Sequence, residues 1–211
     1  MSLQDKVVVI MGASSGIGAA TARLLAERGA KLTLAARRLA RLEEIKSAYP
    51  EASIETVEAD VTDMAAVQSV IDHTVAKFGR VDVLFNNAGI MPVNNLSELA
   101  HQEWQQMLDI NVKGVLNGIA AALPVMRKQK FGHVISTSSV LGYEVLPGYA
   151  AYSGTKFAVR AIMEGLREEE RQNGIKTTVI APGSVKTELF DSINNQEVRE
   201  SLKAAQKQPG A

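Results

Sequence analysis

Short apolar runs alternate with longer helical patterns along almost the entire chain. The runs are rich in β-branched residues and apolar at consecutive positions, which indicates strands buried on both faces of a sheet. The predicted strands cover residues 6–11, 31–36, 53–58, 81–85, 133–137 and 176–180. The predicted helices cover residues 17–28, 39–48, 64–78, 103–127, 149–172 and, in a polar tail, 187–207. This alternation predicts one doubly wound α/β domain with a parallel sheet, spanning residues 1–211.

The composition excludes several classes of partner and site. The 211 residues include 23 basic and 23 acidic side chains, without blocks of like charge, so we expect no nucleic-acid partner. Cysteine is absent, which excludes thiolate metal sites and suits a cytoplasmic protein. The three histidines (His73, His101 and His133) are widely spaced, so we expect no metal. No apolar run reaches the ~18 residues of a membrane span, so we expect no membrane partner.

A glycine-rich turn separates the first predicted strand from the first helix. It reads Gly-Ala-Ser-Ser-Gly-Ile-Gly and contributes the candidate residues Gly12, Ser14, Ser15, Gly16, Ile17 and Gly18. Glycines allow a pyrophosphate to approach a helix N-terminus, where unpaired N–H groups and the helix dipole favour anions. A glycine-rich packing turn is the alternative, but the position between a strand and a helix favours nucleotide binding.

The ends of the second and third strands carry charged residues. Arg37 and Arg38 follow the second strand, where an acidic residue would instead bind a ribose 2′-hydroxyl. Two arginines suit a 2′-phosphate, which favours NADP(H) over NAD(H). The alternative is a solvated first helical turn, to which we assign Arg41. Asp60 and Val61 follow the third strand, where the carboxylate could accept a hydrogen bond from adenine or, like Asp63, cap the next helix.

Polar residues also occur at the next strand ends and inside one helix. Asn87, Ala88 and Gly89 end the Asn-Asn-Ala-Gly segment after the fourth strand and could line a ribose, join neighbouring strands or form a simple turn. Asn111 lies within an apolar helical pattern, where asparagine is unfavourable, and such inconsistencies concentrate at functional sites. Ser139 ends a run of hydroxyl residues after the fifth strand, although serines there are also common turn formers.

Tyr152 and Lys156 are four residues apart on a predicted helix and therefore share one face. A positive charge about 4 Å away, at an effective dielectric constant of about 20, favours the phenolate by about 4 kcal/mol, or about three pKa units. The spacing therefore predicts a tyrosine that is tuned for general acid–base catalysis. An amphipathic helix with a half-buried tyrosine and a solvated lysine is the alternative.

Taken together, these motifs resemble the short-chain dehydrogenase/reductase family, in an NADP-preferring subgroup. The resemblance covers nearly all of residues 6–187 and includes Ser139 thirteen residues before Tyr152, as well as a Pro-Gly-Ser-Val-Lys-Thr segment at 182–187. It implies a Rossmann-like strand order of 3-2-1-4-5-6. It also implies that Tyr152 is the acid–base, that Lys156 lowers the tyrosine pKa and holds the nicotinamide ribose, that Ser139 binds the substrate oxygen, and that Asn111 anchors a water.

The resemblance implies a cofactor cradle that spans the whole domain. The glycine-rich turn would hold the pyrophosphate, Arg37 and Arg38 the 2′-phosphate, and Asp60 and Val61 the adenine. The adenosine ribose would meet Asn87, Ala88 and Gly89, and the nicotinamide end would meet Tyr152, Lys156, Pro182, Gly183, Val185 and Thr187. Residues 184–211 would form a substrate loop and a C-terminal helical segment. The implied activity is NADP(H)-dependent hydride transfer between a small carbonyl compound and its alcohol.

The expected wall of the substrate pocket is mostly apolar. It consists of Met91, Leu141, Tyr143, Leu146, Tyr149, Leu189 and Phe190. Two rival functions remain: a catalytically silent dinucleotide sensor or interaction protein, and an epimerase or dehydratase without net redox change. The family usually has a seventh strand, which this sequence lacks. By analogy we expect a homo-dimer or homo-tetramer formed through the helices at 103–127 and 149–172, although both helices could instead be covered within one subunit.

Overall fold

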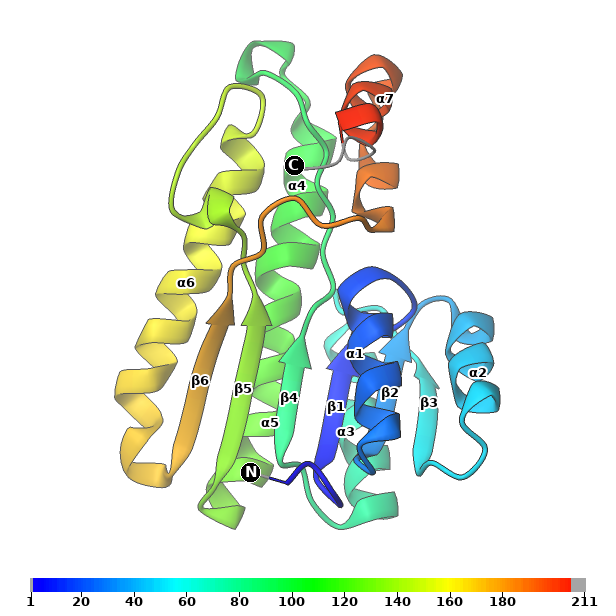
Figure 1. Ribbon diagram of the computed structural model, residues 1–211. Coiled ribbons are helices and arrows are strands. Elements are labelled where there is room, and N and C mark those ends of the chain that lie inside the picture. Colours follow the sequence, from blue (N-terminus) through cyan, green and yellow to red (C-terminus); the bar gives the residue numbers. More distant parts are fainter. Residues whose placement is uncertain (1, 206–211) are drawn as a thin grey trace.

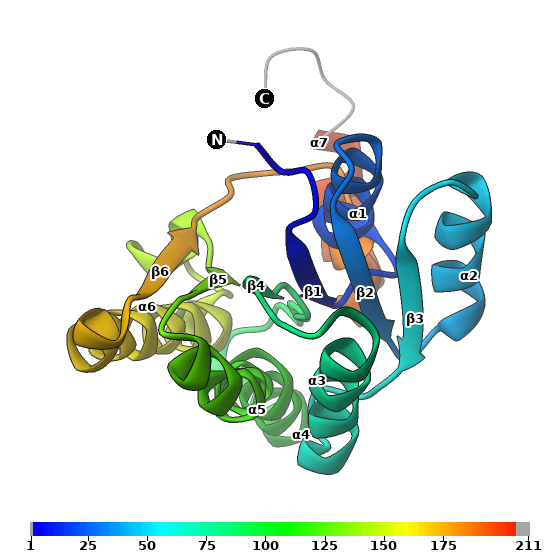
Figure 2. The ribbon, with the colours of Figure 1, turned by 90° about the horizontal axis from the view of Figure 1, so that it is seen from below.

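The computed structural model describes residues 2–205 and contains a six-stranded sheet with helices on both faces (Figures 1 and 2). The strands are β1 (Val7–Met11), β2 (Lys31–Ala36), β3 (Ile54–Glu58), β4 (Val83–Asn86), β5 (Gly132–Thr137) and β6 (Ile175–Ile180). All neighbours are parallel, and their order is β3-β2-β1-β4-β5-β6. The predicted doubly wound, Rossmann-like sheet is therefore confirmed.

Helices follow the strands in the predicted alternation. They are α1 (Gly16–Glu27), α2 (Leu39–Ala48), α3 (Met64–Phe78), α4 (His101–Met107), α5 (Gly114–Gln129), α6 (Ala150–Glu170) and α7 (Gln196–Ala205). In Figure 2, α1 and α2 lie on one face of the sheet, and α3, α5 and α6 lie on the other. Short 3₁₀ turns occur at Val140–Gly142 and Glu188–Ser192, both close to strand ends.

The central strand β1 explains why the strands are apolar at every position. Its five residues are all buried. Val9 and Met11 belong to the core cluster beneath α3 and α5, whereas Val8 and Ile10 belong to the cluster beneath α1 and α2. Because alternate side chains enter opposite layers, both faces must be apolar.

The strand register aligns the carboxyl ends along one edge of the sheet. Met11 of β1 pairs with Ala35 of β2 and with Asn86 of β4, and Asn86 pairs with Ser136 of β5. The segments that follow these strands therefore emerge together. In Figure 1 this edge is at the arrowheads, and the C-terminal segment lies beyond it.

Several boundaries differ from the sequence prediction. The fourth strand begins at Val83, not Val81, because the side-chain amide of Gln129 bonds both the N–H and the carbonyl of Val81. The tail predicted to be helical from residue 187 contains a 3₁₀ turn and then α7, and residues 206–207 lie outside the described residues. No seventh strand follows β6 within residues 181–205.

The helix predicted at 103–127 is interrupted. The helical stretch runs from His101 to Gln129 as α4, a π-helical turn at Leu108–Lys113, and α5. By length and composition alone this stretch of 29 residues could cross a membrane, contrary to the sequence-based expectation. Half of the most apolar 18-residue segment of this stretch is buried within the fold. Packing of a core helix against the sheet therefore accounts for the apolar composition of the stretch.

Candidate active site

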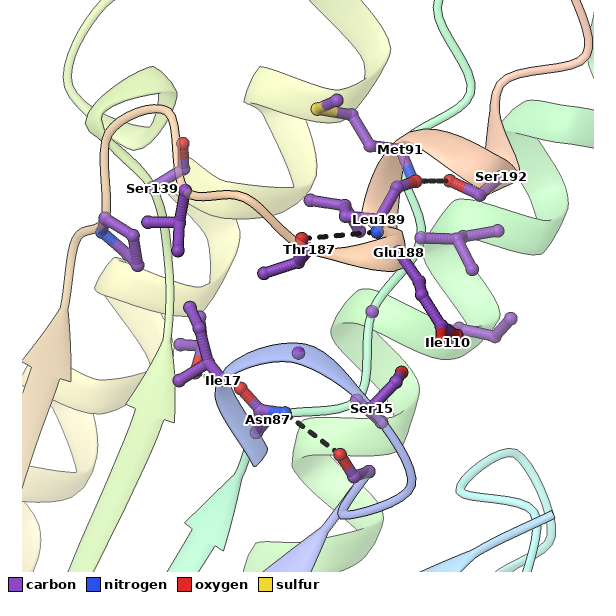
Figure 3. Close-up of a pocket in the computed structure, with 18 of the residues that line it drawn as sticks. Ser15, Ile17, Asn87, Met91, Ile110, Ser139, Thr187, Glu188, Leu189 and Ser192 are labelled. Atoms are coloured by element: carbon purple, nitrogen blue, oxygen red, sulfur yellow. Dashed lines mark hydrogen bonds between the residues drawn. The ribbon is translucent and has the colours of Figure 1, made fainter. Parts of the chain in front are cut away.

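A cavity of about 670 Å³ opens at the carboxyl edge of the sheet, within the size range of small-molecule sites (Figure 3). Nineteen of the twenty-one residues predicted to bind cofactor or act in catalysis belong to its lining. One is Ser139, and the other eighteen lie around the rest of the cavity. They are Gly12, Ser14, Ser15, Gly16, Ile17, Arg37, Arg38, Asp60, Val61, Asn87, Ala88, Gly89, Tyr152, Lys156, Pro182, Gly183, Val185 and Thr187.

The glycine-rich turn brings backbone close to the cavity. Gly12 has a φ of +86°, and a Cβ there would lie 2.6 Å from the backbone nitrogen of Ala88. Ser15 is the N-cap of α1, and its hydroxyl accepts a hydrogen bond from Arg38 at 2.8 Å rather than capping the first turn. The Ser15 side chain therefore leaves the first turn of α1 uncapped, and Gly16 and Ile17 of that turn line the cavity, where an anion is favoured.

Gly18 lies where α1 packs against the glycine-rich turn. Within the described residues, the cavity lining does not include Gly18. A Cβ on Gly18 would collide with the carbonyl oxygen of Gly12 and would lie 2.7 Å from Nδ2 of Asn87. Gly18 therefore allows α1 to pack against the turn.

Arginines from β2 and α2 line the cavity together. Arg38 donates to the hydroxyls of Ser14 and Ser15 at 3.0 and 2.8 Å, and to the carboxylate of Glu188 at 2.9 Å. Arg41 donates to the other oxygen of Glu188. Arg41 lies in the first turn of α2 with its side chain 42% exposed, as the sequence predicted, and it also lines the cavity.

Asp60 is held in a local turn beside Val61. One of its carboxylate oxygens accepts from the N–H and the hydroxyl of Thr62 at 2.9 and 2.8 Å. Burial opposes ionisation, but the two Thr62 bonds and the charge of Arg37 outweigh it, so the pKa of Asp60 is lowered. Asp63, not Asp60, caps α3, through bonds to Ala65 and Ala66. Asp60 therefore remains an acceptor at the cavity wall.

A chain of hydrogen bonds joins the glycine-rich turn to α6. Asn87 donates to the carbonyl oxygen of Gly12 at 3.1 Å and accepts from the hydroxyl of Thr137 at 3.1 Å. The ammonium of Lys156 donates to the carbonyl oxygen of Thr137 at 2.9 Å. The chain runs across β1, β4, β5 and α6, so the predicted strand-joining role of Asn87 is confirmed. Figure 3 shows its bond to Gly12.

Tyr152, Lys156 and Ser139 meet at the cavity. The Lys156 nitrogen lies 5.5 Å from the centre of the Tyr152 ring, and each side chain is only 4% exposed. Ser139 lines the same cavity, and its side chain forms a hydrogen bond with the Tyr152 phenol. The three residues predicted to act on the substrate are therefore adjacent.

The electrostatics of this group correct the sequence-based expectation. Burial raises the pKa of Tyr152 to about 12, although the hydrogen bond from Ser139 opposes the rise. Burial lowers the pKa of Lys156 to about 8. The predicted lowering of the tyrosine pKa is therefore wrong for this structure, because desolvation of the phenol outweighs the hydrogen bond from Ser139. The buried phenol holds its proton at neutral pH.

Asn111 stabilises the site through hydrogen bonds made outside the cavity. It lies in the π-helical turn, is 1% exposed, and within the described chain it is not part of the cavity lining. Its amide accepts from the N–H of Ile90 and donates to the carbonyl of Ile90, both at 2.9 Å, and it donates to the hydroxyl of Thr155 at 3.1 Å. Asn111 therefore joins the loop after β4 to the helix of Tyr152 and Lys156, and π turns are frequent at such positions.

The apolar pocket wall is mostly as predicted. Met91, Leu141, Leu146, Tyr149, Leu189 and Phe190 line the cavity. Tyr143 is 57% exposed, and the guanidinium of Arg160 lies 3.6 Å from the centre of its ring. Its assignment to the wall is wrong, because the cation–π contact holds the ring against α6.

The sequence interpretation missed several lining residues. They are Ala36, Arg41, Ala59, Ile90, Ile110, Thr137, Ser138, Val140, Glu144, Glu188, Asp191 and Ser192. Most of them directly follow or precede predicted residues, so a wider window around each strand end would have found them. Glu188 had no such signal as a partner of Arg38, which is 150 residues away. Within residues 2–205, no group of three or more His, Cys, Asp or Glu side chains is arranged to hold a metal ion.

Comparison with known proteins supports the family resemblance seen in the sequence. Residues 6–198 match the family model described as short chain dehydrogenase. An uncharacterised oxidoreductase of Staphylococcus saprophyticus is 52% identical over 203 residues, which are 95% of this chain and 82% of the relative. One of Listeria monocytogenes is 49% identical over 214 residues, which cover 100% of this chain and 86% of the relative.

Solved structures share the fold. A short-chain dehydrogenase/reductase from Burkholderia phymatum in complex with NAD has a TM-score of 0.91 at 29% identity, covering 100% of this chain and 82% of that one. An alcohol dehydrogenase from Thermococcus sibiricus complexed with 5-hydroxy-NADP has a TM-score of 0.85 at 30% identity, covering 98% and 92%. With the family match over most of its length and a site built on Ser139, Tyr152 and Lys156, this chain belongs to the short-chain dehydrogenase family of oxidoreductases.

Proposed function

We propose that this protein is an NADP(H)-dependent oxidoreductase that interconverts a small ketone or aldehyde with the corresponding alcohol. The observation that carries the proposal is that Ser139, Tyr152 and Lys156 line one cavity with the glycine-rich turn and the arginine cluster. One ligand can therefore contact the phosphate-binding groups while its reactive end reaches the phenol.

The residues of the cavity fit an extended dinucleotide. The first turn of α1 and the hydroxyls of Ser14 and Ser15 offer donors to a pyrophosphate. At Gly12 a Cβ would lie 2.6 Å from the backbone nitrogen of Ala88, so the turn can pack this closely against the loop after β4 only with glycine there. Asp60 offers an acceptor to adenine, and Lys156 offers a donor to the nicotinamide ribose.

The preference for a 2′-phosphate rests on the residues of this chain. Arg37, Arg38 and Arg41 line the cavity after β2, and β2 ends in Ala36 without an acidic residue. Structural neighbours include proteins solved with NAD and with an NADP derivative, so they do not decide the preference. Three guanidinium groups favour the phosphorylated form.

The proton chemistry follows from the buried phenol. A bound nicotinamide supplies or accepts the hydride at the reacting carbon. In reduction, Tyr152 donates its proton to the substrate oxygen as negative charge develops there, and in oxidation the phenolate accepts the hydroxyl proton. Because burial raises the phenol pKa to about 12, the residue is protonated and ready to donate at neutral pH.

Ser139 and Lys156 lower the barrier by electrostatics. The Ser139 hydroxyl can donate to the same substrate oxygen, because it is adjacent to the phenol. The ammonium form of Lys156 stabilises the transient phenolate. Asn111 Oδ1 and Lys156 Nζ flank Gly89, at 3.3 and 3.6 Å from the position of a Cβ there, which suits a water that returns the proton to Lys156.

The substrate contacts an apolar wall. Met91, Leu141, Leu146, Leu189 and Phe190 surround the end of the cavity that contains Ser139. A small or medium carbonyl compound with apolar substituents fits such a wall. Loop residues after β4 and β6 supply most of it, so they determine specificity within this class.

A panel of ketones, aldehydes and alcohols, each assayed with NADPH or NADP and with NADH or NAD, tests the proposal. We expect saturable turnover with at least one carbonyl compound, and faster turnover with the phosphorylated cofactor. Saturable dinucleotide binding without turnover on any compound would instead support the silent sensor.

The association and location of the protein are part of the proposal. The exposed apolar side chains Leu108 and Leu116, near and on α5, and Phe157 on α6 suit a homo-dimer or homo-tetramer formed through these helices. Light scattering of the purified protein tests this, and a monomer at micromolar concentration would contradict it. We also propose a cytoplasmic location, in keeping with a chain that has no cysteine.

A further inference from the structure

The turn after β6 carries a carboxylate into the arginine cluster. Glu188 is the first residue of the 3₁₀ turn Glu188–Ser192. One carboxylate oxygen accepts from Nη1 of Arg38 at 2.9 Å, and the other accepts from Nη1 of Arg41. The carboxylate therefore bridges two guanidinium groups, both of which line the cavity.

The surroundings of this carboxylate are suited to a phosphate. Arg38 also donates to the hydroxyls of Ser14 and Ser15, which brings two guanidinium groups and two hydroxyls together. Arginines in this arrangement bind carboxylates and phosphates with the same fork geometry. Glu188 therefore uses the same donors that a 2′-phosphate would need.

We propose that Glu188 is a specificity-determining residue that competes with the 2′-phosphate of the cofactor for Arg38 and Arg41. The inference rests on the proposed function, because it requires a dinucleotide in this cavity. With a cofactor that lacks the 2′-phosphate, Glu188 keeps both arginines neutralised. With the phosphorylated cofactor, the phosphate displaces Glu188, and this displacement reduces the net preference for the phosphorylated form.

The exposure of the contact makes this competition feasible. The side chains of Arg38, Arg41 and Glu188 are 47%, 42% and 40% exposed. Ion pairs of this exposure contribute little and are screened by salt, so a phosphate with a larger negative charge can replace the carboxylate. Hydrogen bonds from Arg41 and Arg38 lower the pKa of Glu188, so the competitor is ionised at neutral pH.

The same turn is attached to the substrate side of the cavity. Ser192 accepts from the N–H of Met91 at 2.8 Å (Figure 3), and Phe190 and Ile193 are buried with Met91 in one cluster. Trp104, the single tryptophan of the chain, packs against that cluster. Release of Glu188 should therefore change the fluorescence of Trp104.

The test compares two ligands that differ in the 2′-phosphate. Adenosine 2′,5′-bisphosphate and adenosine 5′-monophosphate are titrated by calorimetry into the wild type, Glu188→Gln and Glu44→Gln. Glu44 is the matched control, because it acts on Arg41 by charge alone, without a bond to it in the described structure. Unchanged melting temperatures establish that each variant folds.

We expect Glu188→Gln to tighten binding of the bisphosphate by about fivefold and to change binding of the monophosphate by less than about twofold. Glu44→Gln should change both by less than about twofold. In the wild type, the bisphosphate should alter Trp104 emission, and in Glu188→Gln the emission should start near that altered value.

Three results would overturn the inference. If Glu188→Gln increases the affinity for both ligands equally, only the overall charge of the site matters. The same conclusion follows if Glu44→Gln increases the affinity for the bisphosphate as much as Glu188→Gln does. Weaker bisphosphate binding in Glu188→Gln would mean that Glu188 orders the arginines and does not compete. If the wild type binds neither ligand, and neither NADPH nor NADH, the cavity is not a dinucleotide site and the proposed function is wrong as well. The first two results leave the proposed function intact.

Discussion

Lys156 donates a hydrogen bond to the carbonyl oxygen of Thr137, 2.9 Å away, from a side chain that is 4% exposed. The contact places the one buried lysine of the described core at the carboxyl end of β5. Burial makes its charged form less favourable in the folded protein than in water. The desolvation of Lys156, to which we assign a proposed catalytic role, should therefore be visible in the stability of the fold.

The stability of the protein should rise between pH 8 and pH 10. Burial lowers the pKa of Lys156 from 10.5 to about 8, so in this window the unfolded chain binds more protons than the folded one, and the free energy of unfolding increases with pH. The contribution of this residue is about 3 kcal/mol across the full window. Above pH 10, ionisation of unfolded Tyr152 reverses the trend, since burial raises its folded pKa to about 12.

Urea denaturation of the wild type and Lys156→Met at pH 7.5 and pH 9.5 measures this effect. The wild type should gain stability at the higher pH relative to the variant. An identical pH response in both proteins would mean that Lys156 is solvated in the native state.

Asn111→Ala should destabilise the fold by about 2–3 kcal/mol. The substitution leaves the N–H and carbonyl of Ile90 and the hydroxyl of Thr155 without the amide that now bonds them. Gln68→Ala, on an exposed face of α3, is the control and should change stability by less than about 0.5 kcal/mol. Equal urea midpoints for Asn111→Ala and the wild type would contradict the assigned role of the π turn.

Two glycines should respond in opposite ways to alanine. Gly18→Ala should destabilise the protein and weaken dinucleotide binding, because its Cβ collides with the Gly12 carbonyl. Gly165→Ala, on α6, should stabilise the protein by up to about 1 kcal/mol, since its Cβ meets no atom of the described residues within 4 Å. Thermal melting of both variants checks the pair, and a stabilised Gly18→Ala would disprove the packing argument.

Arg37→Asp should weaken binding of NADP(H) far more than binding of NAD(H). The arginine lines the cavity after β2, where a carboxylate would repel a 2′-phosphate and accept from a 2′-hydroxyl. We expect the ratio of the two dissociation constants to change by at least about tenfold. The charge-matched control is Lys46→Asp, because Lys46 is on α2 and is not part of the described cavity lining. An unchanged ratio would defeat the NADP(H) assignment.

The sheet and most of the cavity could be predicted because their signals are local. A strand such as β1, buried on both faces, must be apolar at every position. In a parallel sheet the residues after each strand gather at one edge, so Arg37, Asp60, Asn87 and Ser139 could be assigned to one site.

The remaining features depend on contacts between distant residues or on burial. The bridge from Glu188 to Arg38 and Arg41 joins segments that are about 150 residues apart, and nothing near Glu188 in the sequence indicates it. The spacing of Tyr152 and Lys156 predicted their proximity but not their desolvation, which reverses the expected direction of the tyrosine pKa. Tyr143 was misplaced because its partner Arg160 follows it by seventeen positions.

The central claim is that the phenol of Tyr152 transfers the proton to or from the substrate. The most direct measurement is the turnover number of Tyr152→Phe on the best substrate of the panel, beside its dissociation constant for NADPH. The control is Tyr49→Phe, at the C-cap of α2 and not part of the described cavity lining. We predict a loss of turnover of about 10³-fold with NADPH binding unchanged within about twofold, and native turnover in the control. A Tyr152→Phe enzyme that retains near-native turnover would contradict the account.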